Sequence, residues 1–246
     1  MPEYSIRYVS PEEDFVLESG FEGPCFIEAE SLEGFTSQFE EEGVSVVGAP
    51  GVVMDFRDRK VLPMEGSFTL VVRDVSVWPR IRGAFSSHRF GSLEVVGDQR
   101  FVLPVRLGAS LPSPSVRPVV GSRVEVVLRS DGGVWVAPVV SPDSDVIVTN
   151  WGDVPVWGRI MWDGPGGRVV MPSGVGFDLP AVEGQHTVFL DRKRAGEVHG
   201  PGGYDRELTR RVDAVSEMVP VGESRTFKTP VGASLAWDVG VFDPWR

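Results

Sequence analysis

The feature that most constrains the fold of this chain is the high frequency of turn-forming residues along its whole length. Glycine occurs 29 times and proline 20 times in 246 residues, and both residues interrupt helices and mark turns. No long window carries apolar residues at the helical spacing of i, i+3, i+4 and i+7. Apolar and polar residues instead alternate with a period of two, which is typical of strands with one buried face. The sequence therefore predicts an all-β fold.

Several segments of the first half of the chain show this alternation. They are residues 4–9, 15–17, 67–74, 101–107, 124–129 and 134–137. The last two are separated by Ser130-Asp-Gly-Gly133, in which Asp-Gly favours the positive φ angles of a hairpin turn. We therefore expect these two strands to pair as a hairpin.

Two other segments of the first half have no clear strand pattern. Residues 31–42 are rich in acidic residues and are expected to form a helix or a charged loop. Residues 76–90 contain Pro79, and a short helix after it would place Ile81, Ala84 and Phe85 on one side.

A boundary between two domains is expected at residues 138–145, Pro-Val-Val-Ser-Pro-Asp-Ser-Asp. It divides the chain into residues 1–145 and residues 146–246. After it, turn signals recur about every 8–12 residues, which is typical of a β-sandwich or barrel. The strands expected there are residues 146–149, 156–162, 168–171, 187–190 and 233–241.

The net charge of −11 is concentrated at one end of the chain. Residues 1–50 contain 12 acidic residues and a single basic one, whereas the other residues contain 23 of each. An acidic segment repels phosphate, so we expect no nucleic-acid partner. Two interpretations remain open: the segment faces a basic surface of a partner, or it is a solvated edge that discourages unwanted strand pairing.

The sequence also bounds the environment of the protein. Cys25 is the only cysteine, so no intramolecular disulfide can form, and we interpret it as a small apolar residue of the core rather than a reactive thiol. Neither a signal peptide nor an apolar run of membrane-spanning length is apparent. We therefore expect a protein that is cytosolic when made and does not insert into membranes. The excess of arginine over lysine (21 against 3) suggests a GC-rich genome.

No nucleotide-binding, zinc-binding or hydrolase motif occurs in the sequence. The best metal candidates are His186, Asp191, His199 and Asp205, but the first two would point to opposite faces of a regular strand. Candidate acid pairs for glycoside hydrolysis are Asp153, Asp163 and Asp178, and all three occupy turn-like positions where Asp commonly bonds the backbone. We therefore expect no enzyme, no cofactor and no metal.

Tryptophans are frequent in the second half of the chain. Trp157 and Trp162 are five residues apart, so along one strand they face opposite sides. One of them at most belongs to the core. The outer tryptophan either contacts another protein or offers a stacking surface to a sugar.

Residues 146–246 resemble the C-terminal domain of the distal tail proteins of long-tailed, siphovirus-type phages, also called minor tail proteins. The resemblance rests on motifs in a fixed order: Val146-Ile-Val-Thr-Asn-Trp-Gly-Asp-Val-Pro-Val156, Asp163-Gly-Pro-Gly166, Thr187-Val-Phe-Leu-Asp191, Glu207-Leu-Thr-Arg210, Val219-Pro-Val-Gly222 and the closing segment 236–246. In the first half, Met54-Asp-Phe-Arg-Asp-Arg-Lys60 followed by residues 62–74 is similar to the polar turn and long strand of that family.

The resemblance implies a fold and a role. It implies an N-terminal β-rich ring-forming domain and a C-terminal galectin-like β-sandwich, assembled as a ring, typically a hexamer, at the tail tip of the virion. The implied partners are other copies of the chain, the tail tube protein and a tail-associated or tail-tip protein, with assembly in the host cytoplasm. The residues that define turns in this reading are Asn150, Gly152, Pro155, Asp191, Pro220 and Gly222.

Two functional hypotheses follow. In the first, the protein is a structural ring that joins the tail tube to the tail tip, and basic residues of one subunit face the acidic segment of the next. The residues proposed for that surface are Arg57, Arg59, Lys60, Arg73, Arg80 and Arg82. The alternative is a carbohydrate-binding module that attaches the particle to a glycan of the host surface.

Overall fold

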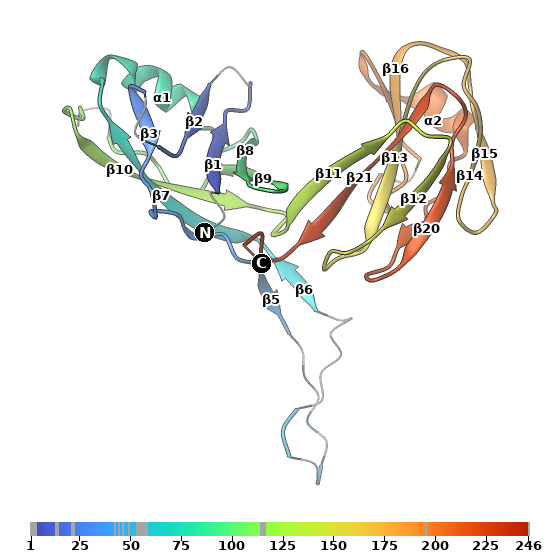
Figure 1. Ribbon diagram of the computed structural model, residues 1–246, viewed down its shortest axis with the longest axis horizontal. Helices are drawn as coiled ribbons and strands as arrows, with labels where there is room; N and C mark the ends of the chain where they lie inside the picture. The colour runs from blue at the N-terminus through green and yellow to red at the C-terminus, as the bar shows by residue number, and fades with distance from the viewer. Residues whose placement is uncertain are drawn as a thin grey trace. The chain divides into compact units, whose positions relative to one another are not determined.

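The computed structural model describes residues 4–12, 15–20, 23–41, 43, 45, 47–48, 50–52, 59–113, 117–194 and 196–245. Strands dominate it (Figure 1), which confirms the predicted all-β class. The helices within the described ranges are the short α1 (Trp78–Ala84) and α2 (Arg206–Val212), with a 3-10 turn, η1 (Val75–Val77). None of them is long and apolar enough to cross a membrane.

The chain divides into two compact units. The first comprises residues 1–135 and 242–246, and the second comprises residues 136–241. The division after Trp135 lies earlier in the chain than the predicted boundary at residues 145 and 146. That residues 146–246 fold alone stays a prediction.

The first unit is built on a continuous antiparallel path of strands, β2-β1-β8-β9-β10-β7-β3, with β4 also paired to β7. A separate pair is formed by β5 and β6. The strand bounds are β1 (Ser5–Val9), β2 (Val16–Glu18), β3 (Cys25–Ile27), β4 (Glu33–Gly34), β5 (Gln38–Glu40), β6 (Lys60–Leu62), β7 (Met64–Val72), β8 (Gly91–Val96), β9 (Arg100–Leu107) and β10 (Ser122–Ser130). A parallel bridge between Ser19 and Ile27 brings the end of β2 beside β3. The first and last strands of the path, β2 and β3, therefore lie next to each other, as in a barrel.

Helix α1 covers one side of this core. It begins with Pro at its first turn, where the missing N–H costs no hydrogen bond. Ile81 and Ala84 of the helix and the following Phe85 are buried, which confirms the predicted helix and its apolar side. Tyr8 ties the helix to β1, because its ring stacks on Phe85 at 4.5 Å and its hydroxyl donates to the carbonyl of Ala84 at 2.8 Å.

Two predictions for the first unit were wrong. Residues 130–133 do not close a hairpin, because β10 pairs with β7 and β9 rather than with the strand that follows it. Of these turn residues, only Gly133 has a positive φ, 64°. Residues 31–42 form neither a helix nor a simple loop, since β4 and β5 lie within them. In both cases pairing with distant strands outweighs the local signal.

The second unit contains two sheets. One has the order β18-β17-β16-β13-β21-β11 with β19 paired to β13, and the other has the order β12-β20-β14-β15. The bounds are β11 (Trp135–Ser141), β12 (Asp145–Thr149), β13 (Val156–Gly164), β14 (Gly167–Val170), β15 (Gly176–Leu179), β16 (Val182–Phe189), β17 (Val198–Gly200), β18 (Gly203–Asp205), β19 (Met218–Val219), β20 (Ser224–Lys228) and β21 (Ala233–Val241). The strands predicted here from sequence all correspond to strands of these sheets.

Each sheet of the second unit buries one face. In β13 the buried residues alternate strictly, from Val156 to Trp162, and in β12 Val146 and Val148 are buried while Ile147 is exposed. This alternation is the pattern of a two-layer arrangement with the core between the layers. Full burial of each such side chain contributes about 1.5–3 kcal/mol.

The prediction for the two tryptophans is confirmed. Trp162 is buried, whereas Trp157 on the opposite face of β13 is only half-buried. The turn assignment is wrong for two of the three acids considered. Asp163 lies in β13 and Asp178 lies in β15, where the carboxylate of Asp178 pairs with Arg168 at 3.0 Å.

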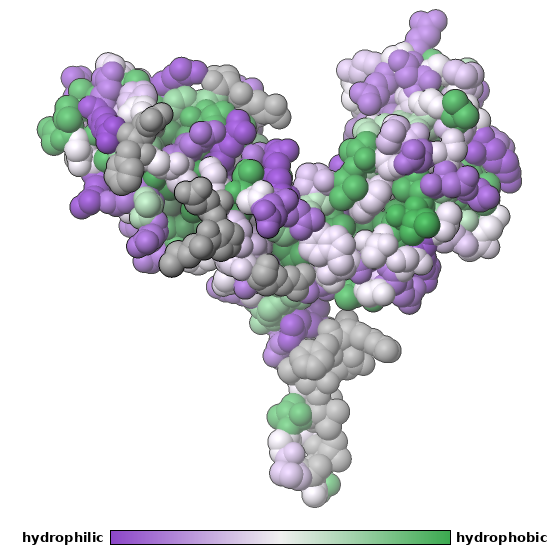
Figure 2. All heavy atoms as spheres, viewed as in Figure 1, coloured by the Kyte–Doolittle hydropathy of each residue, from purple (hydrophilic) through white to green (hydrophobic). Residues whose placement is uncertain are grey.

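The surface seen in Figure 2 is mixed. Hydrophobic residues form small groups separated by hydrophilic ones in each unit. Neither unit presents a single continuous hydrophobic face in this view. Exposed apolar residues of the second unit include Val140, Ile147 and Val231.

Candidate functional site

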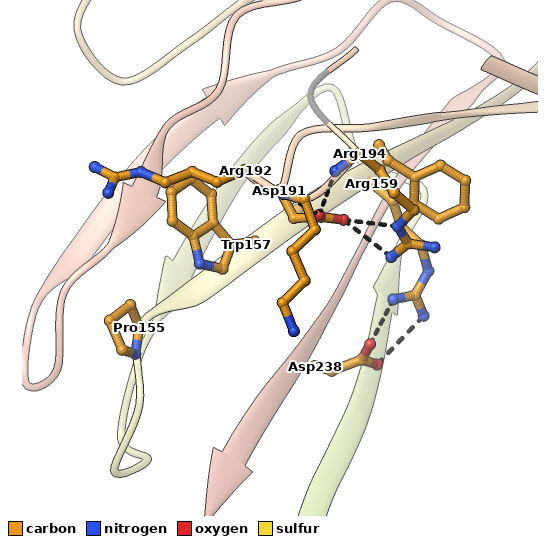
Figure 3. Close-up of a pocket in the computed structure, with 10 residues that line it drawn as sticks. Pro155, Trp157, Arg159, Asp191, Arg192, Arg194 and Asp238 are labelled. Carbon is orange, nitrogen blue, oxygen red and sulfur yellow. Dashed lines mark hydrogen bonds and ion pairs between the residues drawn. The ribbon is translucent and has the colours of Figure 1, made fainter. Parts of the chain in front are cut away.

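A cleft of about 660 Å³ lies on the outer face of the larger sheet of the second unit. Strands β13, β16 and β21 contribute to it, together with the loop that follows β16. Its lining comprises Pro155, Trp157, Gly158, Arg159, Phe189, Asp191, Arg192, Lys193, Arg194 and Asp238. Figure 3 shows the side chains that line it.

Strand register places the central residues of the cleft together. Arg159 lies opposite Phe189 of β16 on one side and Ala236 of β21 on the other. Asp238 is therefore a diagonal neighbour of Arg159 on the same face. The guanidinium of Arg159 donates to both carboxylate oxygens of Asp238, at 2.6 and 3.3 Å (Figure 3).

The loop after β16 is organised by Asp191. Its carboxylate accepts hydrogen bonds from the backbone N–H groups of Lys193 and Arg194, both at 2.9 Å. It also pairs with the guanidinium of Arg194 at 2.9 Å, and that guanidinium lies 3.7 Å from the centre of the Phe189 ring. The turn role predicted for Asp191 therefore has a physical basis, and the turn presents three consecutive basic residues.

Only some of the basic residues that line the cleft are neutralised by acidic residues. Asp238 neutralises Arg159 and Asp191 neutralises Arg194. Arg192 instead lies over the ring of Trp157, at 5.6 Å from its centre. Neither Arg192 nor Lys193 forms an ion pair with an acid in the described part of the chain. The cleft thus combines an aromatic surface, two fixed ion pairs and two cations without a carboxylate partner.

The sequence predicted that one of Trp157 and Trp162 lies on an outer face, but it did not predict which one, and it did not predict the cleft. Arg159 and Asp238 are 79 residues apart, so no local pattern connects them. The run Asp191-Arg-Lys-Arg194 was the only local signal, because consecutive basic residues in a tight turn cannot all be buried.

Four of the predicted turn residues lie together at one corner of the second unit: Asn150, Gly152, Pro220 and Gly222. Asn150 is fully buried, and its side-chain amide donates to the carbonyls of Val154 and Val219, both at 2.9 Å. Its side-chain oxygen accepts from the N–H of Gly152 at 3.0 Å. The N–H of Gly222, at φ 78°, donates to the carbonyl of Asn150 at 2.9 Å. The turn at residues 150–152 and the turn around Gly222 therefore stabilise each other through hydrogen bonds, although they are distant in sequence.

The two prolines among the predicted turn residues, Pro155 and Pro220, have different structural roles. The carbonyl of Pro220 accepts a hydrogen bond from Glu223 at 3.2 Å, which closes the turn around Gly222. Pro155 is exposed, immediately precedes β13 and lines the cleft.

Five of the basic residues predicted for a subunit interface have partners within the chain: Arg59, Lys60, Arg73, Arg80 and Arg82. Arg59 pairs with Glu41 at 2.6 Å and Lys60 with Glu40 at 3.4 Å. Arg73, Arg80 and Arg82 lie over the rings of Phe26, Phe15 and Trp78 respectively. Arg57 lies outside the described residues. Their role between subunits stays a prediction.

The metal candidates are engaged in other contacts. A ring nitrogen of His186 lies 2.9 Å from the carbonyl of Gly184, and His199 pairs with Glu197. Asp205 caps α2 by accepting from the N–H of Leu208 at 2.8 Å. No group of three or more ligating side chains occurs among the described residues.

Cys25 is buried on β3. Burial raises the pKa of its thiol to about 12, so the thiolate is not populated at neutral pH. The interpretation as a core residue is confirmed.

Comparison with solved structures identifies proteins that share this fold. The crystal structure of the SPP1 Dit protein, described as a paradigm of the hub adsorption apparatus in phages that infect Gram-positive bacteria, superposes with a TM-score of 0.54 at 11% identity, over 97% of this chain and 99% of that chain. The chain has the fold of phage Dit hub and baseplate proteins. A chain of the phage P2 baseplate in its activated conformation with Ca gives a TM-score of 0.56 at 9% identity, over 98% of both chains. The same baseplate with Sr gives 0.56 at 9% identity, over 97% and 98%.

The Dit fold was predicted from motifs spread over the second half of the sequence, and the structural likeness extends over nearly the whole chain. No protein-family model and no curated protein matches the sequence. At this level of identity the likeness concerns the fold, and the role of the chain has to be argued separately.

Proposed function

We propose that this protein is a structural component of a phage tail tip, a hub that self-associates and joins other tail proteins. The observation that carries the proposal is the end-to-end match to SPP1 Dit, which covers 97% of this chain and 99% of that chain. Both compact units have counterparts in that match, so neither is an unrelated addition. A shared fold without shared sequence leaves the role to be tested directly.

The finer proposal is a closed ring, with six subunits as the expected number, in the tail of a long-tailed phage. Its neighbours would be the tail tube protein on one side and a tail-associated protein on the other, and its final location would be the virion after assembly in the host cytoplasm. Contacts between unlike surfaces of identical subunits close into rings when the rotation between them permits.

The acidic segment has a more specific part in this proposal. Glu40 and Glu41 already pair with Lys60 and Arg59 of the same chain. Pairing between subunits would therefore have to involve the other acids or exchange these pairs. The Lys60–Glu40 pair is exposed, and exposed pairs contribute about 0–1 kcal/mol, so its exchange between subunits costs little.

We further propose that the protein is not an enzyme. Of the three acids considered for hydrolysis, the carboxylate of Asp178 is paired with the guanidinium of Arg168 at 3.0 Å. A loss of polysaccharide hydrolysis of a hundredfold or more in D163N, a barrier increase of about 2.7 kcal/mol, would contradict this.

The carbohydrate-binding alternative is favoured by one observation, the cleft around Trp157. Sugar binding there would be an activity additional to assembly.

The oligomeric state tests the hub proposal. Light scattering of the purified chain, alone and with tail tube protein, should give a mass near six times the 26.9 kDa of one chain. If charge pairing contributes, the mass should fall as salt rises, because the Debye length decreases from about 10 Å at 0.1 M to about 3 Å at 1 M.

A charge-reversal pair sharpens this experiment. R73E should weaken the assembly, whereas R168E, an equal charge change in the second unit, should leave it intact. A monomer under every condition, even with tail tube protein present, would contradict the ring. A ring indifferent to salt and to R73E would contradict only the electrostatic contact.

A further inference from the structure

We propose that the cleft lined by Trp157, Arg159, Asp191, Arg192, Lys193 and Asp238 binds an acidic saccharide, a chain of sugars that carry carboxylate groups. This goes beyond the hub role and does not depend on it, because every residue involved lies within the second unit of one chain. The cleft combines an aromatic surface, fixed polar groups and positive charge without a carboxylate partner within the described ranges of the chain.

The aromatic surface is Trp157. The strict alternation of β13 sends Trp162 into the core and leaves Trp157 half-buried on the outer face. An indole in this position contributes nothing to the packing between the sheets. Its flat apolar ring is suited to stack against the C–H face of a sugar.

The polar groups are held in place before any ligand arrives. Asp238 fixes the guanidinium of Arg159 through two hydrogen bonds, at 2.6 and 3.3 Å. A guanidinium has further N–H donors, and a carboxylate has further lone pairs. Sugar hydroxyls both donate and accept, so they match a donor and an acceptor fixed side by side. Because both side chains project from strands, little ordering entropy is lost on binding.

The unpaired charge selects an anion. Arg192 and Lys193 lie at the rim of the cleft and are the two lining cations without a carboxylate partner among the described residues. In Figure 3 Arg192 lies beside Trp157, and the Arg159–Asp238 pair lies on the other side of the cleft. A sugar on the indole would therefore have its hydroxyls near Asp238 and a carboxylate within reach of the loop cations.

The same features favour a saccharide over an acidic peptide. Asp238 places a carboxylate in the lining, which would repel closely spaced Asp or Glu side chains. Sugar rings separate their charges and offer hydroxyl groups to that carboxylate.

Calorimetric titration of the full-length protein tests the proposal. The probes are tetragalacturonate, a neutral galactose tetrasaccharide and tetraglutamate. We expect tetragalacturonate to bind at least about tenfold more tightly than either of the others, with an affinity that falls as salt rises. Light scattering on the same samples reports the oligomeric state, so a failed ring and a failed ligand site give different results.

Variants then locate the site. W157A should weaken tetragalacturonate binding by about tenfold or more, and K193Q by about fivefold. The control is K228Q, which removes the same charge from β20, where Lys228 pairs with Asp145 at 3.4 Å. Thermal unfolding by circular dichroism checks that each variant is folded.

Three results would overturn the proposal. One is the absence of tetragalacturonate binding. Another is equal binding of the neutral tetrasaccharide or of tetraglutamate, the latter reassigning the cleft to a protein partner. The third is an equal loss of affinity in K193Q and K228Q, which would mean that only the overall charge matters.

Discussion

The indole N–H of Trp135 donates a hydrogen bond of 2.8 Å to the carbonyl oxygen of Phe35, which lies 100 residues earlier in the chain. Both side chains are fully buried. Phe35 has a φ of 55°, a left-handed conformation that costs a non-glycine residue about 1 kcal/mol or more. The contact with Trp135 is one of the interactions that hold it there.

Removing this hydrogen bond should destabilise the first unit. In W135F the carbonyl of Phe35 is left buried without that donor, and a void replaces part of the indole. We expect the free energy of unfolding to fall by about 1–3 kcal/mol, measured by urea denaturation. The matched control is W157F, whose indole is half-buried in the second unit, and it should cost clearly less. Equal losses would contradict the role given to the Trp135 N–H.

Gly66 is required by the close approach of the Phe35 ring. A Cβ at Gly66 would lie 2.4 Å from Phe35 Cδ2 and 2.5 Å from the carbonyl oxygen of Glu33. G66A should therefore push β4 away from β7 and lower the free energy of unfolding by about 1–3 kcal/mol. G132A is the control, because a Cβ there meets nothing within 4 Å. A G66A protein as stable as G132A would show that β4 adjusts freely.

Asn150 should tolerate neither of its closest replacements. N150D keeps the acceptor for Gly152 but removes both N–H donors and places a carboxylate in a fully buried position. N150A leaves the carbonyls of Val154 and Val219 without their side-chain donor. Each should cost about 2–4 kcal/mol in thermal or urea unfolding. The control Thr149→Ala, on the exposed side of β12, should cost less than about 0.5 kcal/mol.

Asp131 should contribute a small, pH-dependent stabilisation. Hydrogen bonds from Arg106, at 2.7 and 3.0 Å, and then from Arg129 hold the pKa of its carboxyl below the ordinary value. Since the pKa is lower in the folded state, the stabilisation is present above the unfolded-state pKa of about 3.9. It is lost as the pH falls through the folded-state pKa.

D131N should therefore be less stable than the parent protein at pH 7, by less than about 1 kcal/mol because the pair is partly exposed and screened by solvent. The difference should shrink as the pH falls below about 4. Urea unfolding at pH 7, 5 and 3 measures it, with R106Q as the partner variant. If the difference in free energy of unfolding between D131N and the parent protein grew toward low pH, the lowered pKa assigned to Asp131 would be wrong.

Fragment boundaries should matter for the second unit. Strand β11 lies beside β21, and its residue Ala137 is buried. Fragment 136–241 keeps this strand, whereas fragment 146–246 lacks it and leaves an edge of the long β21 unpaired. We expect dispersed amide NMR spectra from the first fragment and lower stability or association from the second. Equal behaviour would favour the boundary drawn from the sequence.

The sequence by itself determined where most strands lie and which residues form turns between them. Period-two alternation located β7, β9, β10, β12, β13 and β21 to within a few residues, because the alternation of side chains across a strand is a local property of the backbone. It also determined that Trp157 and Trp162 face opposite sides. The helix α2 was missed, because its main local signal is the cap at Asp205.

Only the tertiary structure decided which strands pair and where the cleft lies. The turn at residues 130–133 looks like a hairpin, yet β10 pairs with β7 along its whole length. Arg159 meets Asp238 only because β13 and β21 are neighbours in one sheet. The physical reason is that strand pairing is a choice among many distant edges of similar local propensity. Burial of the common core makes that choice, and it cannot be read from any single segment.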